Sequence, residues 1–231
     1  MVAQKKVIPQ SLIWLGWNET IEFKNNWYLN TEIENRTFIL PTNAQHQLLV
    51  RSHIHKTIQE KKWDFSAGMC IFLNSPNNPN AIEKLVVPEL RPHVEVIRRN
   101  YFKQKTIEQR LRIEARFFHS TNADRSVLED GFQFSNYRIR YKCQFVFPII
   151  RISKQMMVKG KLNDEMHLHF SGKTVSHFDQ NRIYAGVTVE TSPKFSIDIG
   201  YMNWYQFQSY QTFYNRDIFR LGFSHKFSLS K

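Results

Sequence analysis

Two pairs of histidines have the spacing in this sequence that comes closest to a metal site. His53 and His55 are separated by one residue, and so are His167 and His169. If both segments are β-strands, each pair lies on one face, and two imidazoles on one face can bind a transition metal ion. The chain has 9 histidines, however, and such pairs arise by chance. We therefore expect solvated histidines in a lumen or at loop ends, and no metal site.

One segment also alternates residue types that occur in acid–base catalysis. Asn163, Glu165 and His167 follow each other at every second position, and a carboxylate beside an imidazole can transfer protons. A structural polar face has the same pattern, and we favour that interpretation. The sequence contains no Gly-x-Ser-x-Gly elbow and no glycine-rich phosphate loop. A hydrolase built on a strand serine such as Ser52 or Ser196 stays open as an alternative, but we predict no catalytic residue, no enzyme and no cofactor.

The two cysteines are expected to remain unpaired thiols. Cys70 has the same parity as the polar Asp64, whereas Cys143 has the parity of Tyr141 and Phe145. In strands these parities point to opposite faces, so the two sulfurs cannot meet without a change of register.

Composition excludes several classes of protein. The 231 residues include 32 Lys plus Arg against 20 Asp plus Glu, a net charge of +12, with 14% aromatic residues and 2 Cys. The aromatic content is too high for a disordered chain, and two cysteines are too few for a disulfide scaffold. No run of about 18 apolar residues indicates a transmembrane helix. The first six residues, Met1 to Lys6, contain no apolar stretch and do not form a signal peptide.

Alternation of apolar and polar residues with period two predicts β-strands throughout. Asn25-Asn26 predicts a hairpin turn, because Asn tolerates positive φ. No linker divides the pattern, so we predict a single domain over 10–231, preceded by an N-terminal lead, 1–9, that could be part of a first strand. The predicted strands are about 12–24, 27–39, 46–58, 63–73, 86–102, 106–118, 132–147, 156–170, 178–190, 195–206 and 213–229.

These segments favour an antiparallel up-and-down transmembrane β-barrel over a soluble sheet. Most have 11–16 residues, longer than the usual 5–6 of soluble strands and suited to tilted membrane strands. Short turns alternate with longer loops, as in outer-membrane barrels, and such barrels have an even number of strands. We therefore predict about 12 strands, with 10 as the alternative. Aromatic residues beside the short turns are expected to form a membrane-interface girdle: Trp27, Trp63, Tyr101, Phe102, Phe147 and Phe195.

The polar faces carry charges of both signs at strict period two. We expect Glu89 and Glu95 to meet Arg110 and Arg112 on the next strand, with Glu108 and Glu114 near Arg138 and Arg140. The alternative is that these charged residues form the solvated outer face of a soluble β-sandwich. The predicted lumen network consists of Glu89, Arg91, Glu95, Glu108, Arg110, Arg112, Glu114, Arg116, Arg138, Arg140, Glu165 and Arg182.

Three polar residues contradict this scheme. Asp164, Asp179 and Asn181 fall on the face assigned to lipid, where a charge at mid-bilayer is costly. Either they stand above the membrane or a β-bulge shifts the register.

The order of several short motifs resembles a family of small outer-membrane β-barrels of Gram-negative bacteria that is classed as a domain of unknown function. The resemblance extends from about residue 12 to 229 and implies an outer-membrane location, export through a signal peptide that this chain lacks, and no established activity. The motifs, together with the Trp27 hairpin, are Glu89-x-Arg91, Arg110-x-Arg112-x-Glu114-x-Arg116, Arg138-x-Arg140-Tyr141, Asn163-x-Glu165, Phe178-Asp179-Gln180-Asn181-Arg182 and Gly200-Tyr201-Met202.

Three functions are consistent with these observations. The first is a non-enzymatic outer-membrane barrel with a structural or accessory role, a charge-filled lumen and partners among outer-membrane lipid and other envelope proteins; a narrow porin-like channel is its variant. The second is an outer-membrane enzyme that acts on lipid or an envelope polymer. The third is a soluble basic β-protein that binds nucleic acid. We favour the first and expect no nucleic-acid partner, because Arg alternates with Glu on the same faces and this weakens a basic footprint.

Overall fold

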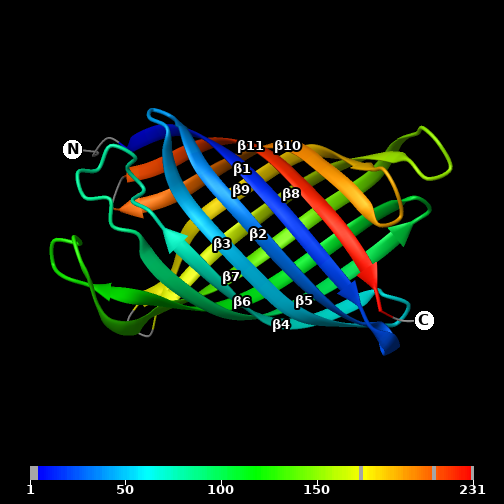
Figure 1. The fold of residues 1–231 in the computed structure, drawn as a ribbon, viewed down its shortest axis with the longest axis horizontal. Helices are drawn as coiled ribbons and strands as arrows, with labels where there is room; N and C mark the ends of the chain where they lie inside the picture. The colour runs from blue at the N-terminus through cyan, green and yellow to red at the C-terminus, as the bar shows by residue number, and fades with distance from the viewer. Residues whose placement is uncertain (1–4, 172–173, 210–211, 230–231) are drawn as a thin grey trace.

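The computed structural model describes residues 5–171, 174–209 and 212–229, which form a closed all-β barrel (Figure 1). No helix among these residues is long and apolar enough to cross a membrane. A single 3-10 turn, η1 (Lys24–Asn26), connects the first two strands. The strands are β1 (Lys6–Glu22), β2 (Trp27–Leu40), β3 (Ala44–Ile58), β4 (Trp63–Asn74), β5 (Val87–Phe102), β6 (Lys105–Thr121), β7 (Leu128–Arg151), β8 (Met157–Ser171), β9 (Thr174–Glu190), β10 (Phe195–Ser209) and β11 (Thr212–Ser228).

The barrel has eleven strands in its described residues, rather than the predicted twelve or ten. Each strand pairs antiparallel with its neighbour in the chain, and β1 closes the barrel by pairing with β11 in parallel. An odd number of up-and-down strands makes the first and last strand run in the same direction, so only a parallel pair can close it. β1 begins at Lys6, so residues 6–9 belong to the first strand, while residues 1–4 of the expected lead lie outside the described part.

The turns at one end of the barrel are short. Asn25 and Asn26 adopt φ of 58° and 60°, which confirms the predicted hairpin turn. At the opposite end the chain passes through 41–43, 75–86 and 122–127 between strands. Only the last two are longer than the short turns, so the predicted alternation of loop lengths is weaker than expected. The strands extend further into these connections than the sequence pattern indicates.

The barrel has an inverted distribution of polarity: charged side chains are buried inside and large apolar side chains are exposed outside. On β6, for example, Arg112 and Glu114 are buried, whereas Leu111 and Ile113, which alternate with them, are each 41% exposed. Successive residues of a strand point to opposite faces, so the exposed residues cover the outer wall and the buried ions fill the lumen.

Part of the lumen is apolar, which the sequence pattern did not indicate. One buried cluster joins side chains of β1, β2, β9, β10 and β11. Arg36, Arg182 and Arg216 stack on the aromatic rings of this cluster, so apolar and charged side chains are mixed on this side of the lumen. The apolar cluster consists of Leu12, Trp14, Phe38, Tyr184, Met202, Trp204 and Ile218.

A β-bulge accounts for Asp179. His167 pairs with Gln180 and Leu168 pairs with Phe178, so Asp179 is the extra residue on β9. Asp179 is consequently buried, and its carboxylate lies 2.8 Å from Arg138 Nη2. Asp164 keeps its outward parity and is exposed, and it accepts a hydrogen bond of 2.7 Å from Asn181 Nδ2.

Candidate functional site in the barrel lumen

The twelve charged residues expected at the lumen all lie on inward-facing positions of β5–β9. Glu108, Arg110 and Arg116 are half-buried, with 13–16% of their side chains exposed. The other nine are buried: Glu89, Arg91, Glu95, Arg112, Glu114, Arg138, Arg140, Glu165 and Arg182. A charge removed from water must be paired and hydrogen-bonded, so the contacts of this set decide the structure of the lumen.

A central chain of ion pairs crosses from β5 to β8. Arg112 Nε donates to Glu95 at 2.6 Å, and Arg110 Nε lies 3.4 Å from the same carboxylate. Arg140 contacts Glu114 at 2.8 Å and Glu165 at 2.9 Å, and Arg110 also reaches Glu165. Each carboxylate is thus shared by two guanidinium groups, and the pairs form one network rather than isolated bridges.

Some expected pairs are replaced by others. Glu89 is bound by Arg91 and Arg116, each at 2.6 Å, and not by Arg110 or Arg112. Glu108 lies 3.0 Å from Arg99 and 3.6 Å from Lys142, and Arg138 binds Asp179 instead. Glu95 binds its register partner Arg112 as expected. Elsewhere the long Arg side chains reach diagonally along the strands, so the register alone does not predict every pair.

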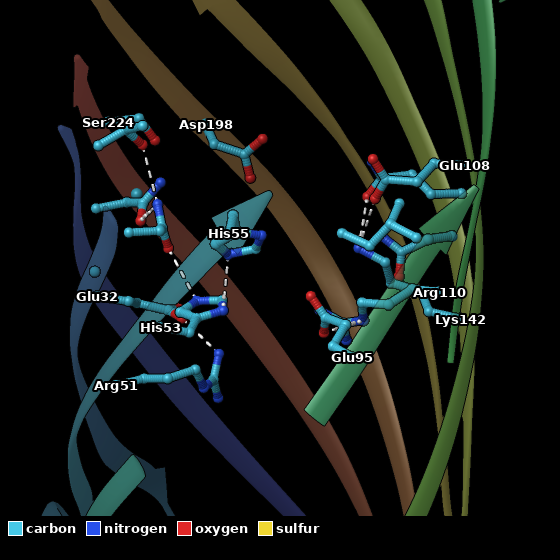
Figure 2. Close-up of a pocket in the computed structure, with 18 of the residues that line it drawn as sticks. Glu32, Arg51, His53, His55, Glu95, Glu108, Arg110, Lys142, Asp198 and Ser224 are labelled. Atoms are coloured by element: carbon cyan, nitrogen blue, oxygen red, sulfur yellow. Dashed lines mark hydrogen bonds and ion pairs between the residues drawn. The ribbon is translucent and has the colours of Figure 1, made fainter. Parts of the chain in front are cut away.

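Three of the four paired histidines are buried rather than solvated as expected: His53, His55 and His167 are 7%, 3% and 1% exposed. The fourth, His169, is half-buried, with 27% of its side chain exposed. His55 Nδ1 lies 2.8 Å from Asp64 Oδ1, and its Nε2 lies 2.9 Å from His53 Nδ1. Figure 2 shows the two imidazoles on β3 beside the Arg51 side chain, with Glu95 opposite. Asp64 also binds Arg99 Nη2 at 3.1 Å.

The candidate acid–base residues belong to the ion network. Gln180 Nε2 donates to His167 Nδ1 at 2.8 Å, and the Gln180 carbonyl oxygen accepts from Trp204 at 3.0 Å, which fixes the amide orientation. His167 therefore carries its hydrogen on Nε2, 3.1 Å from Glu165 Oε2. Glu165 also binds two arginines, so its oxygens are already engaged and this arrangement favours a structural role.

Two cavities occupy the lumen, with volumes of about 810 Å³ toward the short turns and about 910 Å³ toward the longer loops. Arg36 and Arg182 line both of them. The Arg36 guanidinium lies 3.9 Å from the Trp14 ring centre, and that of Arg182 lies 4.4 Å from the Trp204 ring centre. Cation–π stacking thus holds Arg36 and Arg182 at the junction of the two cavities. We call the constriction formed by these two guanidinium groups the waist of the lumen.

The loop 75–86 folds back into one mouth of the barrel. The backbone carbonyl of its Asn77 accepts a hydrogen bond from Gln10 Nε2 at 2.8 Å, and the side-chain Oδ1 accepts one from Arg216 Nη2 at 3.1 Å. His46 Nε2 lies 3.3 Å from Asn77 Oδ1. One loop residue therefore connects β1, β3 and β11 inside the lumen.

Most of the expected girdle aromatics face outward near the short turns. Trp27 is 43% exposed and Phe102 is 56% exposed, and Trp63 alternates with the buried Asp64. Phe195 packs on Phe223 and Trp17 at centroid distances of 6.4 and 6.2 Å.

Phe147 and Tyr101 differ from a simple girdle position. The Phe147 ring covers Gly160 and occupies the space that a Cβ at 160 would need. Tyr101 has the parity of the lumen residue Arg99, and its hydroxyl donates to Lys61 O at 3.4 Å. Tyr101 therefore lies over the barrel mouth rather than on the outer wall.

Both thiols are free, as predicted, with Cys70 buried and Cys143 exposed. Several residues that shape the site were not among the predicted network. Arg51 and Asp64 share the inward parity of His53 and Cys70, and that parity could have identified them. Arg36, Arg216 and Arg220 also have the parity of the polar faces of their strands, and that parity could have identified them as well.

No curated protein matches the chain. No solved structure matches it either. A family model with the description "Protein of unknown function (DUF2490)" matches residues 12–215.

Proposed function

The chain belongs to the DUF2490 family of proteins of unknown function, and we propose that it is a non-enzymatic β-barrel of the bacterial outer membrane. Its lumen is narrow and filled with charge, and its role is structural or accessory. The inverted polarity of the barrel carries this proposal. A closed barrel with apolar residues on its outer wall and ions inside is suited to lipid, whereas a soluble barrel buries its apolar face.

The extent of the apolar outer wall supports lipid as the partner. Exposed large apolar residues occur on every strand, and soluble monomers rarely expose contiguous apolar patches beyond a few hundred Å². Backbone hydrogen bonds are satisfied around the closed barrel, which is the condition for strands in a bilayer. Aromatic side chains near the short turns, such as Trp27, have the amphipathic character of a membrane–water boundary.

The filled lumen supports a structural or accessory role over a wide channel. Two cavities of about 810 and 910 Å³ remain between the side chains of the interior. Here the stacked Arg36 and Arg182 separate the two cavities, and the loop 75–86 occupies one mouth. Guanidinium groups buried in ion pairs are also unavailable as a basic surface for nucleic acid.

Cell fractionation and gel mobility test the location. The full-length protein is expected in the outer-membrane fraction of a Gram-negative host and to migrate faster unheated than after boiling. Recovery in the soluble fraction without detergent, with no heat-dependent shift, would overturn the proposal.

Planar-bilayer recording of the refolded protein tests the lumen. We expect no large, stable conductance. If such conductance appears, the protein is a porin-like channel and the filled-lumen role is wrong, while the membrane location stands.

A further inference from the structure

Three buried side chains of β3 and β5 bring metal-ligating atoms together at the cavity on the short-turn side. The imidazoles of His53 and His55 and the carboxylate of Glu95 each present one ligand atom, and these atoms lie within 4.8 Å of one another. All three residues line the cavity of about 810 Å³ (Figure 2). The period of two on β3 directs both imidazoles to the lumen.

Hydrogen bonds to the outer nitrogens determine where each ring carries its hydrogen. His55 Nδ1 faces the Asp64 carboxylate at 2.8 Å, and because a carboxylate only accepts, His55 Nδ1 is the donor. Asn30 Nδ2 donates to Asn18 Oδ1 at 2.8 Å and to Thr20 Oγ1 at 3.0 Å, which leaves Asn30 Oδ1 as an acceptor. His53 Nε2, 3.1 Å from that oxygen, is therefore also a donor.

The consequence is that two lone pairs face each other. In neutral rings with these tautomers, His53 Nδ1 and His55 Nε2 are both acceptors, yet they lie 2.9 Å apart. Two acceptors at that distance repel unless a positive charge lies between them. That charge is either an additional proton or a metal ion.

Glu95 supplies the third metal-ligating atom, a carboxylate oxygen. Both arginines that contact this carboxylate, Arg112 at 2.6 Å and Arg110 at 3.4 Å, reach its Oε2. In the part of the chain that the structure describes, no hydrogen bond reaches Oε1. One carboxylate oxygen thus remains for a further ligand.

The positive groups around the cluster have carboxylate partners. Arg51 Nη1 lies 2.5 Å from Glu32, Arg112 is bound to Glu95, and Arg99 is bound to Glu108 at 3.0 Å as well as to Asp64. Asp64 accepts from the outer nitrogen of His55, and a Glu95 oxygen lies within 4.8 Å of a ligand atom of each ring. A cation between the imidazoles would therefore have a carboxylate within reach in addition to the two nitrogens.

The surroundings hold the rings in place as metal sites require. An imidazole whose second nitrogen donates to a carboxylate is the usual outer support of a metal-bound histidine, and Asp64 gives this support to His55. The Tyr28 ring stacks on His55 at a centroid distance of 4.2 Å, and its hydroxyl donates to Asp64. Neither ring can rotate without breaking a buried hydrogen bond.

An independent observation comes from His93 on β5. Its ring lies 5.4 Å from that of His53, and its buried Nε2 has no hydrogen-bond partner among the described residues. Gly68 lies between the two histidines in the register, and a Cβ at 68 would come within 2.7 Å of His53 Cα. The glycine provides the space for this close approach of the two rings. The unpartnered His93 Nε2 adds a further metal-ligating nitrogen beside the cluster.

We propose that His53 Nδ1, His55 Nε2 and Glu95 Oε1 bind a divalent transition metal ion, with Zn²⁺ as the best match. Two imidazoles and a carboxylate are a known zinc donor set that leaves a fourth position for water. Zn–N distances of about 2.0–2.1 Å at a tetrahedral angle place two nitrogens about 3.3 Å apart. The two rings would separate by only a few tenths of an ångström.

The test uses the full-length chain refolded in detergent, stripped with a chelator and dialysed against a slight excess of Zn²⁺. Elemental analysis is expected to find one zinc per chain, and Co²⁺ in its place is expected to give the visible absorption of a tetrahedral site. Wild-type protein that retains no zinc, or a shared proton found by ¹⁵N NMR between the rings in the presence of zinc, would overturn the proposal.

Variants locate the metal. His55→Gln and Glu95→Gln are expected to lose the bound zinc, and Asp64→Asn to weaken binding about 10- to 100-fold. His167→Gln is the matched control, since His167 is equally buried beside a glutamate but lies outside the cluster, and it should retain one zinc. Full retention by both ligand variants would contradict the assignment. Binding is measured without a membrane, so its failure is independent of the proposed outer-membrane role.

Discussion

Arg140 binds the Glu165 carboxylate through two of its nitrogens, Nη2 and Nε. Nη2 lies 2.9 Å from Oε1 and 3.0 Å from Oε2, and Nε lies 3.1 Å from Oε1. The remaining Nη1 donates to Glu114 at 2.8 Å. One side chain on β7 therefore bridges two carboxylates, one on β6 and one on β8, inside the lumen. This arrangement makes Arg140 the residue whose loss should matter most to the network.

Replacing Arg140 by Met should destabilise the barrel strongly. It leaves Glu114 and Glu165 buried with fewer positive partners, and breaking a buried pair in this way costs about 3–5 kcal/mol. Chemical unfolding of protein refolded into vesicles measures the effect. Lys62→Met is the control, because Lys62 makes only an exposed pair with Glu60 at 3.5 Å, and such pairs contribute about 0–1 kcal/mol. Equal effects of the two substitutions would refute the importance of the network.

Replacing Ile113 by Arg tests whether the outer wall faces lipid. Ile113 lies at the middle of β6 and pairs with Val94 and Ile139 on the outer face. A lipid-facing arginine at the midplane costs about 2–4 kcal/mol, whereas a water-facing surface tolerates it. The free energy of unfolding in vesicles is compared with that of Ile82→Arg, since Ile82 lies in the loop 75–86 and is 95% exposed. No difference between these variants would argue against the membrane proposal.

Removing the waist arginines should open the lumen. In the double variant Arg36→Ala/Arg182→Ala, the two cavities lose the guanidinium groups that separate them, and ion conductance through refolded protein should rise. Arg151→Ala is the control, because Arg151 is exposed near a short turn and contacts only Lys154 O. If the double variant folds, as heat-dependent mobility would show, and its conductance equals that of wild type, then the arginines do not form the constriction.

Removing the Asn77 side chain should release the loop 75–86 from the barrel mouth. Asn77→Ala loses the contacts of Asn77 Oδ1 with Arg216 and His46, while the backbone bond from Gln10 persists. Trypsin cleavage after Lys84 should become faster because the loop spends more time outside. The Ile82→Ala variant should be cleaved at the wild-type rate. Unchanged cleavage in Asn77→Ala would indicate that the loop is held by other contacts.

The hairpins and face patterns could be predicted from local sequence because they depend on local geometry. The Asn25-Asn26 turn follows from the positive φ that Asn accepts, and strand parity follows from a period of two. Asp179 shows where this reasoning fails. Its parity assigned it to the outer wall, and only the bulge opposite His167 and Leu168 turns it toward Arg138.

Parity predicted only some of the ion pairs within the lumen: Glu95 does meet Arg110 and Arg112, and Glu114 meets Arg140, but other pairs differ. Glu89 binds Arg91 of its own strand, and Arg140 contacts Glu165 although its register partner is His167. An Arg side chain is long enough to reach carboxylates several residues away along the strands. Many different ion pairs are therefore consistent with the same alternation of charged residues. The apolar cluster in the lumen was also not predicted from the sequence. Leu12 and Trp14 have the same residue types as the outer wall, and composition does not show on which side they lie.

The sequence by itself determined an all-β chain with one charged face and one apolar face per strand, because side-chain alternation is a property of the extended backbone. Tertiary structure alone decided that β1 meets β11 in parallel, that His53, His55 and Glu95 converge, and that Arg36 and Arg182 divide the lumen. These are contacts between distant segments. They depend on closure, register and the reach of long side chains, none of which is encoded in the local pattern.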